Sequence, residues 1–204
     1  MQTMERLRGF TNSEQVRQSI RETDKMDISL FNASNRLDQI VYYLTGEQFG
    51  DWNTVQGLTI LDLGCGSEYS SNWVRKMMGI HDAPNLCRLL SARGANAFGI
   101  DLDPASEKDK EVYTHIQADL LDYILQEGLQ TMPQLQEIKF DIIHSHELVG
   151  EFPSPTLEDG LERRGLHIRE FRRLLVEQSA LMMKVLLLDD ITLKKINGQL
   201  VPTK

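Results

Sequence analysis

Residues 58–68 have the sequence Leu58-Thr59-Ile60-Leu61-Asp62-Leu63-Gly64-Cys65-Gly66-Ser67-Glu68, and this stretch decides the fold of the chain. Its apolar, β-branched beginning predicts a buried strand, and residues 70–78 after it can form a helix. Because glycine has no Cβ, Gly64 and Gly66 let the backbone take positive φ angles and let a ligand come close. A strand, two glycines and the free amides of a helix N-terminus together predict a nucleotide-type site.

Two families of ligand compete for this turn. The dinucleotide fingerprint needs a third glycine at position 69, where the chain has Tyr69, so a nicotinamide oxidoreductase is disfavoured. The segment Leu61-Asp62-Leu63-Gly64-Cys65-Gly66 resembles the first motif of the class I S-adenosylmethionine (SAM)-dependent methyltransferases. That family often has a third glycine where this chain has Glu68. A strand-to-helix turn without a ligand is the plain alternative.

The rest of the chain alternates between predicted strands and helices. Strands are predicted at 97–101, 113–118, 138–144 and 181–188, and helices at 13–23, 34–45 (capped by Asn35), 84–92, 120–130 and 157–177. Gly160 and Gly165 are candidate interruptions of the last helix. A helix at 69–78 and a turn at 79–84 extend the first crossover. Residues 191–196 and 199–201, separated by Asn197-Gly198, predict a hairpin. The alternation predicts an α/β fold, a three-layer α/β/α sandwich with a mostly parallel, Rossmann-like sheet of the methyltransferase type.

Composition and length limit the function. The 204 residues suit one compact domain, with N-terminal helices (1–57) packing on a SAM-binding core (58–204). A net charge of −8 disfavours nonspecific binding to nucleic acid, and no apolar run long enough for a membrane span or a signal peptide is present. Only Cys65 and Cys87 occur, without metal-ligand spacing, so we expect reduced thiols, no metal site and a cytoplasmic location.

Acidic residues follow the second and third predicted strands. Asp101 matches the family position that accepts both ribose hydroxyls, and Asp103 is either a weaker candidate for that role or the N-cap of a following helix. Asp119 matches the acceptor for the adenine amino group, and its alternative role is helix capping. By the resemblance, Asp62 lies toward the methionine end of SAM. The predicted cofactor-binding residues are therefore Asp62, Gly64, Cys65, Gly66, Asp101, Leu102, Asp119, Leu120 and His144.

The segment after the fourth predicted strand meets the methyl group in the family. There His144, His146 and Glu147 are candidate general bases, with His146 and Glu147 as the predicted catalytic residues; a satisfied histidine at a strand end is the alternative for His144. Residues 145–150 are somewhat similar to the acidic loop of protein arginine methyltransferases, although His146 interrupts the spacing.

The predicted function is SAM-dependent methyl transfer to a small molecule or a protein side chain. An arginine-methyltransferase-like protein and a SAM-fold binding protein without catalysis remain alternatives. Too few residues follow Leu188 for a helix and two full strands, so we expect a shortened C-terminal end. A shortened sheet edge makes pairing with a second subunit a further prediction. The sequence leaves the acceptor and the oligomeric state open.

Overall fold

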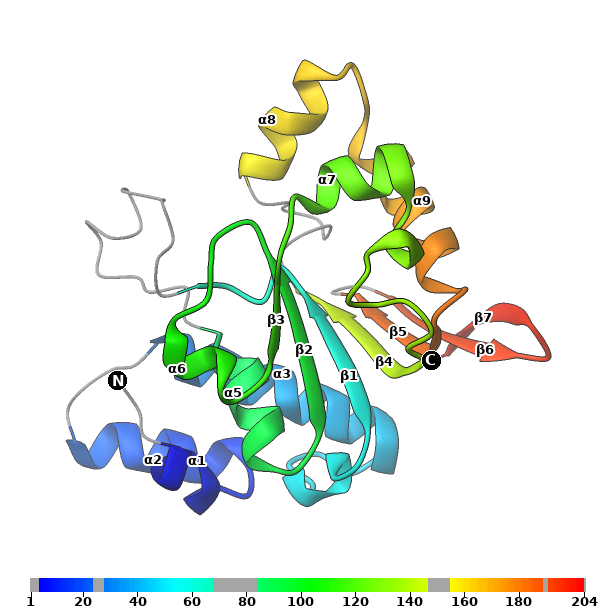
Figure 1. Cartoon of the computed structure of the whole chain (residues 1–204). Helices are drawn as coiled ribbons and strands as arrows, with labels where there is room; N and C mark the ends of the chain where they lie inside the picture. The colour runs from blue at the N-terminus through cyan, green and yellow to red at the C-terminus, as the bar shows by residue number, and fades with distance from the viewer. Residues whose placement is uncertain (1–3, 24–27, 68–83, 147–154, 189–190, 204) are drawn as a thin grey trace.

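The computed structural model describes residues 4–23, 28–67, 84–146, 155–188 and 191–203. Seven strands form one sheet in the order β3-β2-β1-β4-β5-β6-β7 (Figure 1). Strands β1 to β5 are parallel, β6 is antiparallel to β5, and β7 is antiparallel to β6. Their bounds are β1 Thr59–Leu63, β2 Asn96–Asp101, β3 Thr114–Gln117, β4 Phe140–Ser145, β5 Met183–Leu188, β6 Ile191–Ile196 and β7 Gln199–Thr203. The predicted mostly parallel sheet is confirmed.

One face of the sheet is covered by the N-terminal helices and the helix that precedes β2 (Figure 1). These elements are α1 (Met4–Gly9), α2 (Ser13–Thr23), α3 (Ile28–Thr45), the 3-10 helix η1 (Trp52–Val55) and α5 (Asn85–Ala92). Their apolar side chains share one buried cluster with Ile60 of β1, Ile142 of β4 and Val185 of β5. Trp52 is fully buried there, and its Nε1 donates to Asp38 Oδ1 at 2.6 Å.

The opposite face is covered by the helices that follow β3 and β4. These are α7 (Leu120–Asp122), the π-helical turn η2 (Tyr123–Glu127), the 3-10 turn η3 (Leu129–Thr131), α8 (Pro155–Arg163) and α9 (Ile168–Ser179), while the short α6 (Glu107–Lys110) joins β2 to β3. Leu61, Ile143 and Leu186 point to this side, one residue out of step with the first cluster, as the two-residue period of a strand requires. The predicted three-layer sandwich is confirmed. None of the described helices is long and apolar enough to cross a membrane.

Three helix predictions need correction. Helix α3 begins at Ile28 rather than after Asn35, because the buried Leu30 and Ala33 already continue its apolar stripe. The helix predicted at 120–130 changes to a π turn at Tyr123 and stops at Gly128, whose φ is 92°. The predicted helix at 157–177 is two helices: of its two candidate interruptions, Gly165, with a φ of 65°, separates α8 from α9, and Gly160 lies inside α8. The predicted helix at 69–78 and most of the turn after it lie outside the described residues.

The C-terminal hairpin is confirmed. Asn197 and Gly198 both have positive φ, 51° and 82°, as a two-residue turn between twisted strands needs. Residues 191–203 form β6 and β7 and contain no helix. The expected shortening of this end leaves no room for a helix between Leu188, the end of β5, and Ile191, the start of β6, and the sheet keeps two further strands beyond β5.

Candidate functional site

The glycine turn after β1 is tied to the end of β2. Gly64 and Gly66 have φ angles of 73° and 85°, which glycine alone adopts without strain. The backbone N–H groups of Gly64 and Cys65 both donate to the carbonyl of Ile100, at 2.9 and 3.1 Å. The two strand ends are thus held side by side, and the turn arches over the sheet edge where ligands bind in open parallel sheets.

The carboxylate of Asp101 lies at this turn. Its Oδ2 accepts from the Gly66 N–H at 2.9 Å, and its Oδ1 accepts from the Asp103 N–H at 3.0 Å. Burial raises the pKa of Asp101, while these two backbone hydrogen bonds act in the opposite direction. Each carboxylate oxygen keeps one lone pair, so the group is able to accept two further hydrogen bonds. The next residue, Leu102, is 51% exposed.

Asp103 does not cap the following helix. That role belongs to Ser106, whose Oγ accepts from the Asp109 N–H at the start of α6. The capping alternative for Asp103 is therefore wrong, because α6 begins only at Glu107.

Asp119 does cap a helix. Its Oδ1 accepts from the N–H groups of Leu121 and Asp122, at 2.9 and 3.4 Å, at the start of α7. Among the described residues its Oδ2 has no partner, so the cap uses one oxygen and leaves the other for a ligand. Leu120 is buried in the cluster beneath α7, and its backbone N–H is the one in this turn that the Asp119 cap does not use.

Asp62 and His144 form a buried pair across β1 and β4. The two residues are direct neighbours in the parallel register, and His144 Nδ1 lies 2.7 Å from Asp62 Oδ1. Their side chains are 1% and 3% exposed. Because a carboxylate only accepts, Nδ1 carries the proton of this bond. Among the described residues, the buried Asp62 Oδ2 and the neighbouring Ser145 Oγ have no hydrogen-bond partner.

The underside of the glycine turn is sealed by two thiols. Cys65 and Cys87 are both buried and unpaired by a disulfide. A Cβ on Gly99 would stand 2.6 Å from Cys65 Sγ and 3.0 Å from Cys87 Sγ, so the three residues fit only because Gly99 lacks one. The hydrogen bond between the thiols, and then burial, raise the pKa of Cys65, which keeps it neutral. The Cys65 side chain therefore faces the protein.

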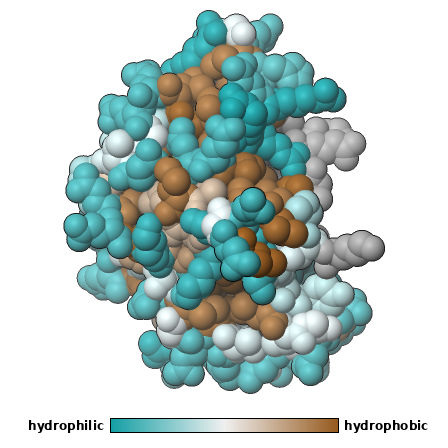
Figure 2. All heavy atoms as spheres, turned by 90° about the vertical axis from the view of Figure 1, so that its right-hand side faces the viewer, coloured by the Kyte–Doolittle hydropathy of each residue, from teal (hydrophilic) through white to brown (hydrophobic). Residues whose placement is uncertain are grey.

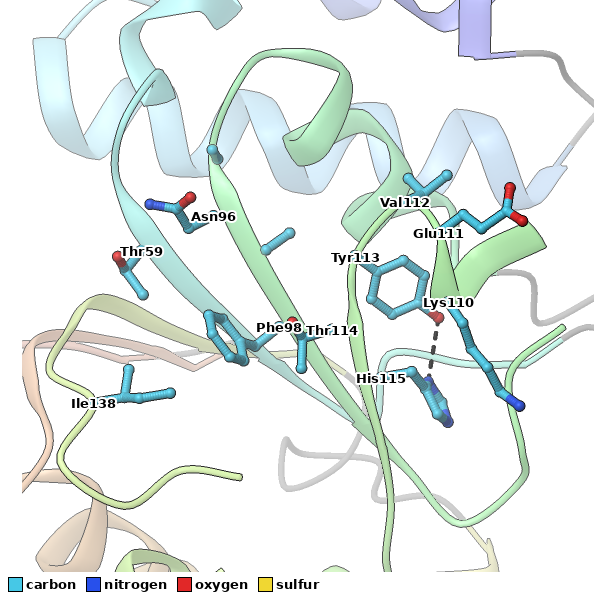
Figure 3. A pocket seen from close by; sticks show the side chains of 12 residues that line it. Thr59, Asn96, Phe98, Lys110, Glu111, Val112, Tyr113, Thr114, His115 and Ile138 are labelled. Atoms are coloured by element: carbon cyan, nitrogen blue, oxygen red, sulfur yellow. Dashed lines mark hydrogen bonds between the residues drawn. The ribbon is translucent and has the colours of Figure 1, made fainter. Parts of the chain in front are cut away.

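His115 of β3 is a structural support that the sequence did not indicate. Its Nε2 lies 3.0 Å from the carbonyl oxygen of Asp103, and its Nδ1 lies 3.2 Å from Tyr113 Oη (Figure 3). These contacts brace the segment that follows Asp101. An isolated histidine on an edge strand carries no pattern that would have revealed this role.

A cavity of about 710 Å³ runs beside β3 and the beginnings of β1 and β2 (Figure 3). Thr59 and Asn96, the first residues of β1 and β2, line it. The cavity therefore extends toward the N-terminal ends of these strands, whereas the carboxylates of Asp62, Asp101 and Asp119 lie at or just beyond the C-terminal ends of β1, β2 and β3. It is not the predicted site.

A second cavity, of about 960 Å³, does reach the predicted site. It lies between α3 and the ends of β4 and β5, and the hairpin formed by β6 and β7 contributes to its wall. His144 and Ser145 line it at the end of β4. We call it the α3 cavity.

The predicted catalytic residues are His146 and Glu147. His146 is half-buried at the end of the described segment, and its ring stacks on that of His144 with centroids 6.5 Å apart and an interplanar angle of 18°. Glu147 lies outside the described residues. Within the described part of the chain, no group of three His, Cys, Asp or Glu side chains could hold a metal ion.

Comparison with known proteins gives a distant likeness. No family model and no curated protein matches the chain. Two solved structures of magnesium protoporphyrin IX methyltransferase from Synechocystis PCC 6803 are similar in structure. The one with bound SAH shares 17% identity over 91% of this chain and 70% of its own, with a TM-score of 0.43. The one with bound SAM shares 17% over 80% of this chain and 63% of its own, with a TM-score of 0.42. A likeness this low assigns no function, and the fold follows from the sheet itself.

Proposed function

We propose that this chain is a SAM-dependent methyltransferase that acts on a small molecule or a protein side chain. The observation that carries the proposal is the hydrogen bond from Gly66 N–H to Asp101 Oδ2, 2.9 Å long. It joins the glycine turn after β1 to the carboxylate after β2, the two features that bind a nucleoside in the family that the sequence resembles.

The residues present fit this cofactor. Asp62 Oδ2 is a buried oxygen without a partner in the described part of the chain, and the α-ammonium group of a methionine moiety would supply one. Asp101 has lone pairs left for two ribose hydroxyls. Asp119 Oδ2 is left for the adenine amino group, and the Leu120 N–H for the adenine ring. Gly64, Cys65 and Gly66 provide a backbone turn without bulky side chains, and Leu102 an exposed apolar contact.

SAM supplies an activated methyl group bound to a cationic sulfur. The protein's own contribution is alignment, because an in-line displacement needs the acceptor, the methyl carbon and the sulfur in one line. A general base is needed only for an acceptor that arrives protonated. His144 at the end of β4, His146 just after this strand, and Glu147, which lies outside the described residues, are proposed for this contact with the acceptor.

We also propose a cellular location, a domain organisation and a surface for pairing. A cytoplasmic location is consistent with the two buried free thiols. The helices of residues 1–57 and the core of 58–204 share a hydrophobic cluster and are proposed to form one domain. Pairing with a second copy would use an edge strand, β3 or β7.

The test is methyl transfer from SAM that carries a labelled methyl group, with the full chain and a cell extract, small molecules and proteins being collected separately. We expect label in one fraction and none with the Asp101→Ala variant. Isothermal titration with SAM and with NAD accompanies it. Binding of NAD and not of SAM would overturn the proposal, while SAM binding without transfer would favour a binding protein on the same fold.

A further inference from the structure

We propose that the α3 cavity binds the methyl acceptor, that the acceptor is an aromatic hydroxy acid, and that His144, held by Asp62, takes its hydroxyl proton. The inference rests on the proposed function and gives it a substrate class.

The α3 cavity lies close to the proposed cofactor site. His144 lies in its wall and, in the sheet, directly beside Asp62, which is two residues before Gly64. The cavity and the glycine turn therefore lie next to the same buried pair. An acceptor in the cavity would approach the cofactor past His144.

The wall of the α3 cavity is aromatic along α3 and the loop after it. Tyr42 and Tyr43 of α3 and Phe49 line it, and Tyr42 and Phe49 are 58% and 39% exposed. Large exposed rings in a concave wall suit a flat ring, because aromatic pairs gain beyond their buried area. Figure 2 views the molecule from the side of β6 and β7 and shows apolar side chains gathered in the middle of this face, with polar ones above and below.

Two cations give the cavity a preference for a carboxylate. Arg17 lines it, with its guanidinium 5.7 Å from the centroid of Phe49 and 3.9 Å from Glu14. Lys194 of β6 lines it as well, and its side-chain ammonium makes no ion pair or hydrogen bond within the described residues. The acidic side chain of the wall, Asp38, already accepts from Trp52 Nε1 and the Ser13 N–H. Lys194 is therefore the proposed anchor for an anion.

His144 is arranged as a general base. Its Nδ1–H is held by Asp62 Oδ1, so Nε2 carries the lone pair, and no hydrogen bond to Nε2 occurs among the described residues. A carboxylate at Nδ1 fixes the tautomer and stabilises the imidazolium that forms. The acceptor oxygen bonds to the methyl carbon as the carbon–sulfur bond breaks, with that electron pair left on sulfur. The hydroxyl proton goes to Nε2 and then to water.

Binding is tested on the full chain saturated with S-adenosylhomocysteine, by isothermal titration with three probes. These are 4-hydroxycinnamate, 4-methoxycinnamate, which has no free hydroxyl, and 4-hydroxycinnamyl alcohol, which has no carboxylate. We expect the two acids to bind about tenfold more tightly than the alcohol. Lys194→Gln should remove this difference. The matched change Lys184→Gln on the neighbouring strand β5 should keep it, because Lys184 does not line the cavity and its Nζ already donates to Asp141 Oδ1 at 2.6 Å.

Catalysis is tested with His144→Asn, because asparagine keeps a donor for Asp62 and lacks Nε2. With 4-hydroxycinnamate, we expect kcat to fall by about a hundredfold or more, with the affinities for S-adenosylhomocysteine and for 4-methoxycinnamate within threefold of the parent. These two affinities also report that the variant is folded.

The outcomes separate the two proposals. If S-adenosylhomocysteine does not bind, the proposed function fails and this inference fails with it. If it binds but no probe does, or if Lys194→Gln leaves the preference for the acids unchanged, the acceptor class is wrong and the proposed function stands. An unchanged kcat in His144→Asn would remove His144 as the base.

Discussion

The two halves of the site are built differently. On the glycine-turn side, at the ends of β1, β2 and β3, the polar groups are bonded to the protein: Asp101 to Gly66 and Asp103, and Asp119 to α7. On the cavity side, at the end of β4, Ser145 Oγ is buried without a partner in the described part of the chain, and so is Oδ2 of Asp62, which lies beside His144 on the adjacent strand β1.

Polar groups that are bonded within the protein stabilise the fold, whereas polar groups without a partner are available to a ligand. Hydrogen bonds that close within the protein make the glycine turn a fixed frame, and a buried polar group without a partner costs stability unless a ligand completes it. We therefore expect substitutions in the frame behind the glycine turn to act mainly on folding, and substitutions of groups that keep acceptor capacity for a ligand, such as Asp101, to act mainly on binding.

The largest effect is expected behind the glycine turn. Arg88 and Asp109 form a buried bidentate pair, with distances of 2.7 and 2.9 Å, that joins α5 to the segment after β2. Asp109→Ala would leave a buried guanidinium uncompensated and should lower the free energy of unfolding by about 3–5 kcal/mol in urea titrations. The exposed pair Lys110–Glu107 is the control, and Lys110→Gln should cost less than about 0.5 kcal/mol. Equal losses in the two variants would contradict a rigid frame.

The next largest loss of stability is expected where Gly99 packs against the thiols of Cys65 and Cys87. Gly99→Ala places a methyl group 2.6 Å from Cys65 Sγ and should destabilise the protein by about 1–3 kcal/mol. Adding Cys65→Ala removes the sulfur, so the double variant should recover part of the loss in the same urea titration. Gly9→Ala, where nothing lies within 4 Å of the added Cβ, is the control. If the double variant loses as much as the two single changes added together, the contact is not the cause.

The affinity for the cofactor should depend on pH through the ionisation of Asp101 on the glycine-turn side. Burial raises the pKa of Asp101 above the ordinary value of 3.8, and the ionised form is the one that accepts from ribose. Affinity for S-adenosylhomocysteine should therefore be constant near pH 7 and fall, at about tenfold per unit, as the pH drops below that raised pKa. Because the folded pKa is raised, Asp101 stabilises the fold only at low pH and loses this contribution as the pH rises through it. Asp101→Asn should bind weakly, without this fall; a fall that persists in the variant would contradict the assignment.

The smallest effect is expected on the cavity side. Ser145 Oγ is buried without a partner in the described residues, so Ser145→Ala removes a desolvated hydroxyl and breaks no hydrogen bond within that part of the chain. Thermal unfolding should show no loss, or a gain of up to about 1 kcal/mol. A loss above about 1 kcal/mol would mean that the cavity side is as closed as the glycine-turn side.

Local chemistry made much of the fold predictable. The central strands are buried apolar runs bounded by glycines or polar residues, and Asn197-Gly198 specifies its turn. The break at Gly165 was one of two candidate positions, because glycine marks an interruption without deciding which glycine makes it. The start of α3 was missed because the buried stripe ran further than a cap at Asn35 suggested.

The place of a candidate site residue could be predicted from the sequence only where that residue lies at the end of a single strand. Asp101 and Asp119 stand where their strands predict, and the structure adds what each is bonded to. The pair of Asp62 and His144 depends on the register between β1 and β4, with 82 residues between them in the chain. The α3 cavity depends on how a helix lies against a distant hairpin. Neither relation has a local sequence pattern.

The central claim, that the carboxylate of Asp101 and the glycine turn bind the nucleoside of SAM, is tested most directly by isothermal titration of S-adenosylhomocysteine into the full chain and into Asp101→Ala. We predict one site per chain and a loss of about a hundredfold or more in the variant, since two charged hydrogen bonds disappear. Equal affinity of the two proteins, or no binding by the parent, would contradict the account.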